Sequence, residues 1–265
     1  MTIIDLLLLY LLSSIKVIFI PQSRIIIQGV CTLLNMALPI LHIFAAVLNS
    51  YILWYDQVYV NVPFEKGMDS YPFRSRVLFL TLWNFVLHGV YHWVALANDV
   101  FGTDEASPRN PPLIRKLKDL LFTLAFPLGV YVSIAFWSVY AVDKELIFPE
   151  RVEKAYPPWI NHPLHTFVSI FIILEMLTSN VTYPRRMIGL AMINIFMFSY
   201  LGLLFVVYGR TGEWVYPVLA YFNWPLRISF CLGSVVIGHL FYFVGESLNK
   251  KFNSSPKVKG KEKSR

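Results

Sequence analysis

The chain has 265 residues, of which 56% are hydrophobic, 16% are aromatic and only 15% are charged. Soluble domains average about 25% charged residues, so this composition excludes a globule that covers itself with polar groups in water. It indicates a protein that lies in a lipid bilayer. The net charge of +7 does not indicate nucleic-acid binding, because seven of the 23 basic residues lie in the last sixteen positions and the others flank apolar runs, where lipid headgroups favour them.

The N-terminal segment, residues 1–32, contains an apolar stretch at residues 2–20 that is interrupted by Lys16. No basic residue precedes this stretch and no small-residue cleavage site follows it, so the sequence does not predict a cleaved signal peptide. The segment is expected to be either an interfacial helix or an extra span.

Six further apolar segments follow, each near the length of about 20 residues that a helix needs to cross the hydrocarbon core. They are residues 33–54, 77–98, 118–141, 164–180, 187–208 and 226–248. The sequence therefore predicts an all-α polytopic membrane protein, a six-span helical bundle over residues 33–249 with the additional N-terminal apolar segment. Cys31 and Cys231 lie inside apolar runs and are expected to be buried core residues. Residues 250–265 are polar and basic, which predicts a disordered tail.

The distribution of lysine and arginine predicts a cytosolic C-terminus, because that orientation places 15 basic residues on the cytosolic side and 8 on the lumenal side. Lys261 and Lys263 have the spacing of the dilysine retrieval signal of endoplasmic reticulum membrane proteins. This predicts the endoplasmic reticulum membrane, with the plasma membrane as the alternative. The sequons at Asn180 and Asn253 would then be cytosolic and should carry no sugar.

The second span carries an unusual set of polar residues: Thr81, Asn84, His88 and His92. Spacings of three, four and four place these side chains on one face of a helix. Polar groups inside a membrane span cost free energy, so they raise the hypothesis of a functional site.

The start of the fourth span, Asn161-His162-Pro163-Leu164-His165, lies on the same side of the membrane as the start of the second. Thr81 is five residues past Arg76, roughly 7–8 Å along the helix, and His165 is at a similar shallow depth. A threonine hydroxyl needs a nearby base to become a nucleophile, and histidine is the usual base. Spacing alone leaves open that Thr81 bonds back to its own helix and that His165 faces headgroups.

Several segments, in order over roughly residues 37–250, carry a resemblance to a known family. They are Phe79-Leu80-Thr81-Leu82-Trp83-Asn84, Ala125-Phe126-Pro127-Leu128-Gly129-Val130, Phe136-Trp137-Ser138-Val139-Tyr140-Ala141-Val142-Asp143, Trp159-Ile160-Asn161-His162-Pro163-Leu164-His165-Thr166, Leu174-Glu175-Met176, Trp214-Val215-Tyr216-Pro217 and Gly245-Glu246-Ser247-Leu248-Asn249. Together they resemble the androgen-induced transmembrane hydrolases, which are described as threonine hydrolases of fatty-acid esters of hydroxy fatty acids. The resemblance implies that Thr81 is the nucleophile and His165 the catalytic histidine.

The chain also departs from that family. Residues 1–36 are additional, Asn84 stands where some members have an aspartate, and Pro163 replaces a glycine. These departures bear on substrate preference more than on the type of reaction.

The predicted function is that of a membrane-embedded lipid ester hydrolase that uses a threonine nucleophile and a histidine base, without a metal or other cofactor. Asn84, His88, Asn161 and His162 are candidates for binding the substrate or supporting the site. Asn161 could cap the fourth span or donate to a developing oxyanion. The expected partners are the lipid ester and the surrounding membrane lipids, with no nucleic acid and no obligate protein partner.

Two other functions remain open. The first is a membrane protein that binds lipid or a partner without catalysis. The second, less favoured, is a metal-dependent lipid oxidase, because His88-x3-His92 and His162-x2-His165 superficially resemble histidine boxes. Such boxes contain adjacent histidines, whereas none of the six histidines of this chain is adjacent to another.

Overall fold

The structure is a computed structural model that describes residues 24–65, 67–106 and 108–252, with side chains described from Ala37 onward. Regular structure in these residues is entirely helical, as predicted. The helices are α2 (Arg24–Tyr59), α3 (Leu80–Phe101), α4 (Leu113–Val142), α5 (Glu150–Glu153), α6 (Pro158–His162), α7 (Val168–Thr178), α8 (Arg186–Thr211), α9 (Pro217–Tyr221) and α10 (Trp224–Phe252). Short 3₁₀ turns cover Arg76–Leu78 and Lys144–Leu146, and a π-helical turn covers Pro163–Phe167. The predicted segment 2–20 lies outside the described residues, as does the predicted tail beyond Phe252.

Five helices of the described chain are long and apolar enough to cross a membrane. They are Ala37–Tyr59, Leu113–Val142, Pro158–Thr178, Arg186–Thr211 and Trp224–Phe252. The predicted second span, residues 77–98, forms α3, which has 22 residues but is not among the five. Its buried polar residues, Asn84, His88 and His92, lower its hydropathy. The all-helical membrane bundle is confirmed, whereas the number of six spans stays a prediction.

The first and the last described helices extend beyond the predicted spans. α2 begins at Arg24 rather than near residue 33, and α10 continues to Phe252, past residue 249. Hydropathy marks only the part of a helix that suits lipid, whereas the backbone hydrogen bonds continue until a turn interrupts them. At the C-terminus of α8, Gly212 provides that turn with a φ of 77°, and its N–H donates to the Tyr208 carbonyl at 2.8 Å.

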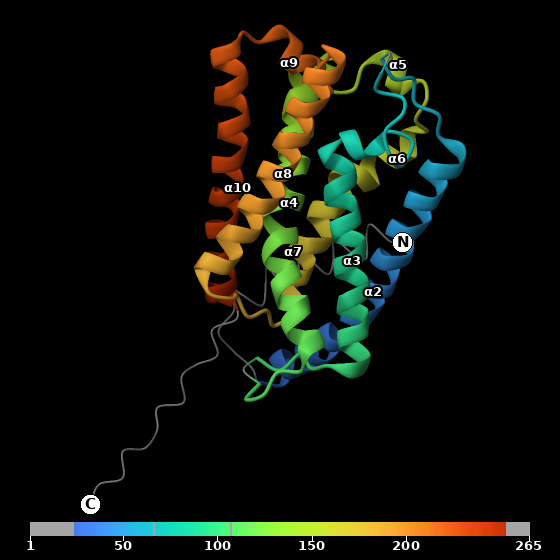
Figure 1. Cartoon of the computed structure of the whole chain (residues 1–265). Helices are drawn as coiled ribbons and strands as arrows, with labels where there is room; N and C mark the ends of the chain where they lie inside the picture. Colours follow the sequence, from blue (N-terminus) through green and yellow to red (C-terminus); the bar gives the residue numbers. More distant parts are fainter. Residues whose placement is uncertain (1–23, 66, 107, 253–265) are drawn as a thin grey trace, which may run out of the picture.

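The long helices stand side by side, with α3 packed mainly against α2 and α4 (Figure 1). The upper end in Figure 1 carries α5, α6, α9 and the start of α3. The lower end carries the turn from α3 into α4 and the turn from α7 into α8. The starts of α3 and of the α6–α7 span therefore lie at the same end, as the topology predicted.

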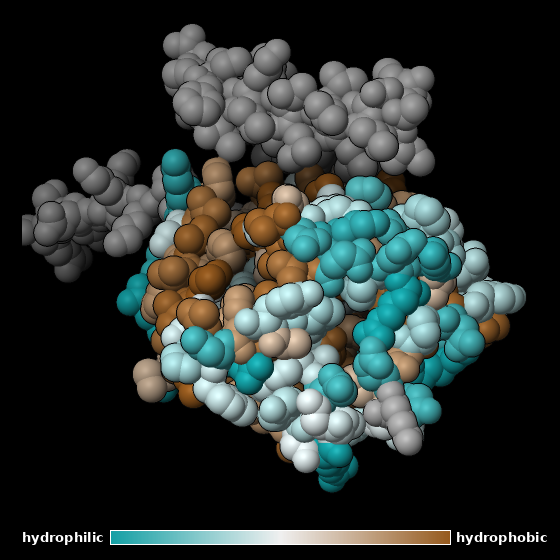
Figure 2. Space-filling model, turned by 90° about the horizontal axis from the view of Figure 1, so that it is seen from above, coloured by the Kyte–Doolittle hydropathy of each residue, from teal (hydrophilic) through white to brown (hydrophobic). Residues whose placement is uncertain are grey.

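The bundle exposes apolar side chains over its sides and polar ones over its upper end. Seen from that end, hydrophilic residues gather over much of the surface and a hydrophobic area adjoins them on one side (Figure 2). On α10 alone, Leu226, Phe230, Val236 and Leu240 are exposed. Large exposed apolar surfaces are unfavourable in water and are accommodated by lipid tails, so this surface fits a bilayer.

Candidate active site

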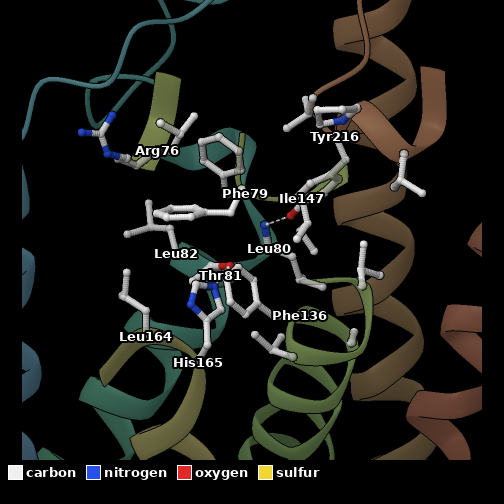
Figure 3. A pocket seen from close by; sticks show the side chains of 18 of the residues that line it. Arg76, Phe79, Leu80, Thr81, Leu82, Phe136, Ile147, Leu164, His165 and Tyr216 are labelled. Atoms are coloured by element: carbon white, nitrogen blue, oxygen red, sulfur yellow. Dashed lines mark hydrogen bonds between the residues drawn. The ribbon is translucent and has the colours of Figure 1, made fainter. Parts of the chain in front are cut away.

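Thr81 and His165 come together at the upper end of the bundle. Thr81 lies in the first turn of α3, and its Oγ1 is 3.1 Å from Nε2 of His165, which lies in the π-helical turn (Figure 3). Other threonines, Thr123, Thr178 and Thr211, donate to carbonyls of their own helices, which is the usual bond of a threonine in a membrane helix. The Thr81 hydroxyl instead pairs with a side chain from another helix.

Asn161 fixes which nitrogen of His165 carries the proton. Nδ1 of His165 lies 2.7 Å from Oδ1 of Asn161 and 3.1 Å from the Asn161 backbone carbonyl oxygen. A backbone carbonyl can only accept, so Nδ1 carries the hydrogen and Nε2 presents its lone pair to Thr81. This is the tautomer that a general base requires. The three residues have the geometry expected of a nucleophile, a base and a group that orients the base.

The π-helical turn and a ring from α4 hold His165 in place. Pro163 cannot donate a backbone hydrogen bond, so the α-helical ladder is interrupted between α6 and α7. Such widened turns occur frequently at functional sites. Phe136 of α4 stacks on the imidazole with the ring centroids 3.5 Å apart and the planes at 11°. His165 is only 5% exposed, so its ring has little freedom to turn away from Thr81.

Two tyrosines anchor the first residue of α3. The Leu80 N–H donates to the Tyr216 hydroxyl at 3.0 Å (Figure 3). The Tyr200 hydroxyl donates to the Leu78 carbonyl at 2.9 Å. The two hydroxyl oxygens are 3.0 Å apart. Burial raises the pKa of Tyr216 to about 12, so its phenol stays neutral at neutral pH. These bonds fix the helix start that carries Thr81.

A cavity of about 180 Å³ opens beside the pair and is lined mainly by apolar side chains. Thr81, Asn161 and His165 line it together with residues from α2, α4, α8 and α10. Its walls include Ile52, Phe85, Val132, Leu201, Leu204 and Val218. The arrangement can hold apolar chains next to a hydroxyl and a base.

Two ion pairs also contribute to the lining of this cavity. Nε of Arg76 donates to Oδ1 of Asp56 at 3.1 Å, and Arg151 pairs with Glu65. The loop that leads to Arg76 has three consecutive positive φ angles, at Phe73, Arg74 and Ser75 (53°, 51° and 64°). Non-glycine residues rarely adopt this conformation, and such strain is common where a loop shapes a site.

The other residues assigned to the site occupy different places. His162 is exposed, 3.3 Å from the Thr166 hydroxyl, and stacks on Trp137. Asn84 and His88 are fully buried on α3 below the cavity and do not line it. Asn161 lies within the site and inside α6, where its Oδ1 accepts from His165; the residue that caps α6 is Pro157, so Asn161 is not the helix cap. Phe136 and Tyr216 are not among the predicted site residues, although both lie in segments that carry the family resemblance.

Within the described residues, no three histidine, cysteine, aspartate or glutamate side chains are arranged to hold a metal ion. Nε2 of His88 donates to the Ala125 carbonyl oxygen at 3.1 Å, in the middle of α4, whereas His165 lies in the π-helical turn after α6, at the upper end (Figure 1). The two histidine pairs that resemble metal-binding boxes therefore do not converge.

Sequence comparisons relate this chain to known proteins. The family model described as FAR-17a/AIG1-like protein matches residues 36–250. The human androgen-induced gene 1 protein is 34% identical over 219 residues, which is 80% of this chain and 92% of that protein. The androgen-dependent TFPI-regulating protein of Mesocricetus auratus is 30% identical over 207 residues, covering 75% of this chain and 89% of that protein. No solved structure matches the chain. A match over nearly all of the described bundle shows that the chain belongs to the FAR-17a/AIG1-like family.

Proposed function

We propose that this protein is a membrane-embedded hydrolase of lipid esters, with fatty-acid esters of hydroxy fatty acids as its substrates. The observation that carries the proposal is the hydrogen bond of 3.1 Å between Thr81 Oγ1 and His165 Nε2, inside an apolar cavity. The bond from His165 Nδ1 to Asn161 supports it, because it presents the basic nitrogen to the hydroxyl.

The geometry suits a two-step acyl transfer. Thr81 Oγ1 attacks the ester carbonyl carbon while its proton passes to Nε2 of His165. The intermediate then collapses, the carbon–oxygen bond to the alcohol breaks, and His165 returns the proton to the leaving oxygen. Water next attacks the threonine ester with His165 again accepting a proton, which releases the carboxylic acid and restores the Thr81 hydroxyl. Asn161 stays hydrogen-bonded to Nδ1 throughout and stabilises the charged ring.

The surroundings of the pair favour a lipid substrate. The apolar cavity walls can receive acyl chains, and two of the charged residues that line the cavity, Arg151 and Glu65, are about half-exposed and can face water. We place the upper end on the lumenal side of the endoplasmic reticulum membrane, with the C-terminus in the cytosol, because the basic residues follow that orientation. Water for the second step would then enter from the lumen.

The test is ester hydrolysis by membranes that contain the full chain or its variants. Thr81→Ala and His165→Ala should reduce hydrolysis of a fatty-acid ester of a hydroxy fatty acid to the level of membranes without the protein. Thr178→Ala is the matched control, because its hydroxyl binds only the Leu174 carbonyl of its own helix. It should hydrolyse the ester like the wild type.

Protein amounts measured in the same membranes separate loss of chemistry from loss of protein. Hydrolysis that is unchanged in both the Thr81 and the His165 variants, at equal protein levels, would refute the proposal. That result would favour a lipid-binding membrane protein without catalysis.

A further inference from the structure

Below the cavity, one face of α3 continues as a line of buried polar residues. Asn84, His88 and His92 are all 0% exposed, and His92 lies beside His42 of α2, which binds Glu175 of α7; these two residues are also 0% exposed. We call these five residues the polar column. From Thr81 to Asp99 the helix rises roughly 27 Å, at 1.5 Å per residue. That length is close to the roughly 30 Å thickness of the hydrocarbon core.

The lower part of the column is an ionic cluster that reaches the surface. Nδ1 of His42 is 2.6 Å from Asp99 and its Nε2 is 2.6 Å from Glu175. Glu175 also pairs with Lys118 at 3.2 Å, and Lys118 pairs with Asp104 at 3.2 Å. The side chains of Asp99 and Asp104 are 10% and 25% exposed. The cluster therefore connects the buried His42 to the lower end of the bundle.

Other charged groups complete this lower end. Arg115 pairs with Asp119 at 3.0 Å and with Asp104 at 3.5 Å. The charged groups of the cluster and these neighbours belong to α2, α3, α4, α7 and the loop after α3. Each element packed at the lower end of the column therefore contributes an acidic or a basic group. No group there needs to carry an isolated charge.

The middle of the column lacks partners within the protein. Both ring nitrogens of His92, Nδ1 of His88 and both amide atoms of Asn84 have no hydrogen-bond partner among the described residues. A buried polar atom left unpaired costs about 1–3 kcal/mol. These atoms therefore need small polar molecules as hydrogen-bond partners, and water is the simplest such molecule. The ring of His92 lies 6.3 Å from those of both His42 and His88, measured between centroids. One water molecule can bridge ring nitrogens at such a separation.

We propose that the polar column is a proton path through the membrane-embedded core, which links the Thr81–His165 cavity to the lower end of the bundle. The neutral imidazole of His92, with both nitrogens unpaired within the described part of the chain, can accept a proton on one nitrogen and release the other from its second nitrogen, so it moves a proton by the width of the ring. His88 keeps its Nε2 hydrogen on the Ala125 carbonyl, so its Nδ1 and the Asn84 amide serve to hold the water molecules that carry the proton between His92 and the cavity. Chains of histidine and carboxylate side chains serve as proton relays within membranes. One proton that enters at the cavity is matched by one that leaves at Asp99 or Asp104, and only N–H and O–H bonds change. The path does not depend on ester hydrolysis, because Asn84, His88 and His92 take no part in the proposed acyl transfer at Thr81 and His165.

The experiment uses the purified full chain in phosphatidylcholine vesicles that contain a pH-sensitive dye. A potassium gradient with valinomycin sets a potential, negative inside, that drives protons inward. Wild-type vesicles should acidify several-fold faster than protein-free vesicles. His92→Gln keeps a polar side chain of similar size but cannot relay a proton, so it should acidify at the protein-free rate. His239→Gln is the matched control, because His239 lies on α10 and binds the Val235 carbonyl, outside the column. It should behave like the wild type.

Two outcomes overturn the proposal: acidification by the wild type at the protein-free rate, or equal acidification by the wild type and His92→Gln. Thr81→Ala separates this proposal from the proposed hydrolase function. It should keep the proton flux and lose ester hydrolysis, so either function can fail without the other. Size-exclusion profiles and circular dichroism of each variant before reconstitution show that the compared proteins are folded.

Discussion

At the scale of single residues, Asn161 determines how well His165 can act as a base. Its side-chain oxygen and its backbone carbonyl both face Nδ1, so the ring is held by two acceptors while Phe136 covers one of its faces. An orienting group of this kind keeps the imidazole in the tautomer that accepts the nucleophile's proton. Asn161 is therefore a positioning residue for the proposed reaction.

Substitution at this residue should change turnover more than binding. We expect Asn161→Ala to lower kcat by about 10²-fold, the lower end of what general-base catalysis contributes, with KM nearly unchanged because the apolar cavity remains. Asn161→Asp keeps an acceptor at the same distance and should retain more of the activity than Asn161→Ala. Steady-state ester hydrolysis by purified protein measures both constants. Equal kcat in Asn161→Ala and the wild type would contradict the orienting role.

At the scale of the elements, α3 and α4 approach closely where Gly129 faces His88. A Cβ at position 129 would lie 2.6 Å from Nε2 of His88 and 3.5 Å from a side-chain carbon of Ile172. His88 is fully buried and hydrogen-bonded to the Ala125 carbonyl, so its ring cannot move aside without losing that bond. The absence of a side chain at Gly129 thus allows the two helices to pack.

We expect Gly129→Ala to destabilise the protein by about 1–3 kcal/mol, the usual cost of overpacking a core. Thermal unfolding in detergent, compared with the wild type under the same conditions, measures the change. Gly202→Ala on α8 is the matched control, because nothing lies within 4 Å of a Cβ at that position. It should leave stability equal or raise it by up to about 1 kcal/mol. If Gly129→Ala unfolds at the same temperature as the wild type, the His88 ring can move away from the added Cβ, and the account of this contact is wrong.

The elements also show what a sequence can and cannot predict here. Hydropathy located the long helices, since a helix that crosses lipid must be apolar over its length. The second and fourth predicted spans begin on the same side of the membrane, and this predicted that Thr81 and His165 could meet. The bond from His165 to Asn161 depends on a π-helical turn that no periodic pattern reveals. The contact of His42 with Glu175 joins residues 133 positions apart. Such pairings follow from the packing of whole helices and not from spacing within one.

At the scale of the whole molecule, the two ends of the bundle have different chemistry. The upper end holds a Thr–His–Asn site beside a mainly apolar cavity, and the ion pairs that line this cavity are Arg76–Asp56 and Arg151–Glu65. The lower end holds the ionic cluster around His42 and Glu175. Exposed apolar side chains cover the helices between these ends.

The most direct measurement of the central claim is covalent labelling of the full chain in membranes by an alkyl fluorophosphonate, followed by mass spectrometry of its peptides. A threonine hydroxyl activated by His165 should displace fluoride and carry the adduct on Thr81. The adduct should be absent from Thr81→Ala and strongly reduced in His165→Ala, while Thr178→Ala is labelled like the wild type. An unlabelled Thr81 in protein that hydrolyses the ester, or an adduct on another residue that accounts for the activity, would contradict the account.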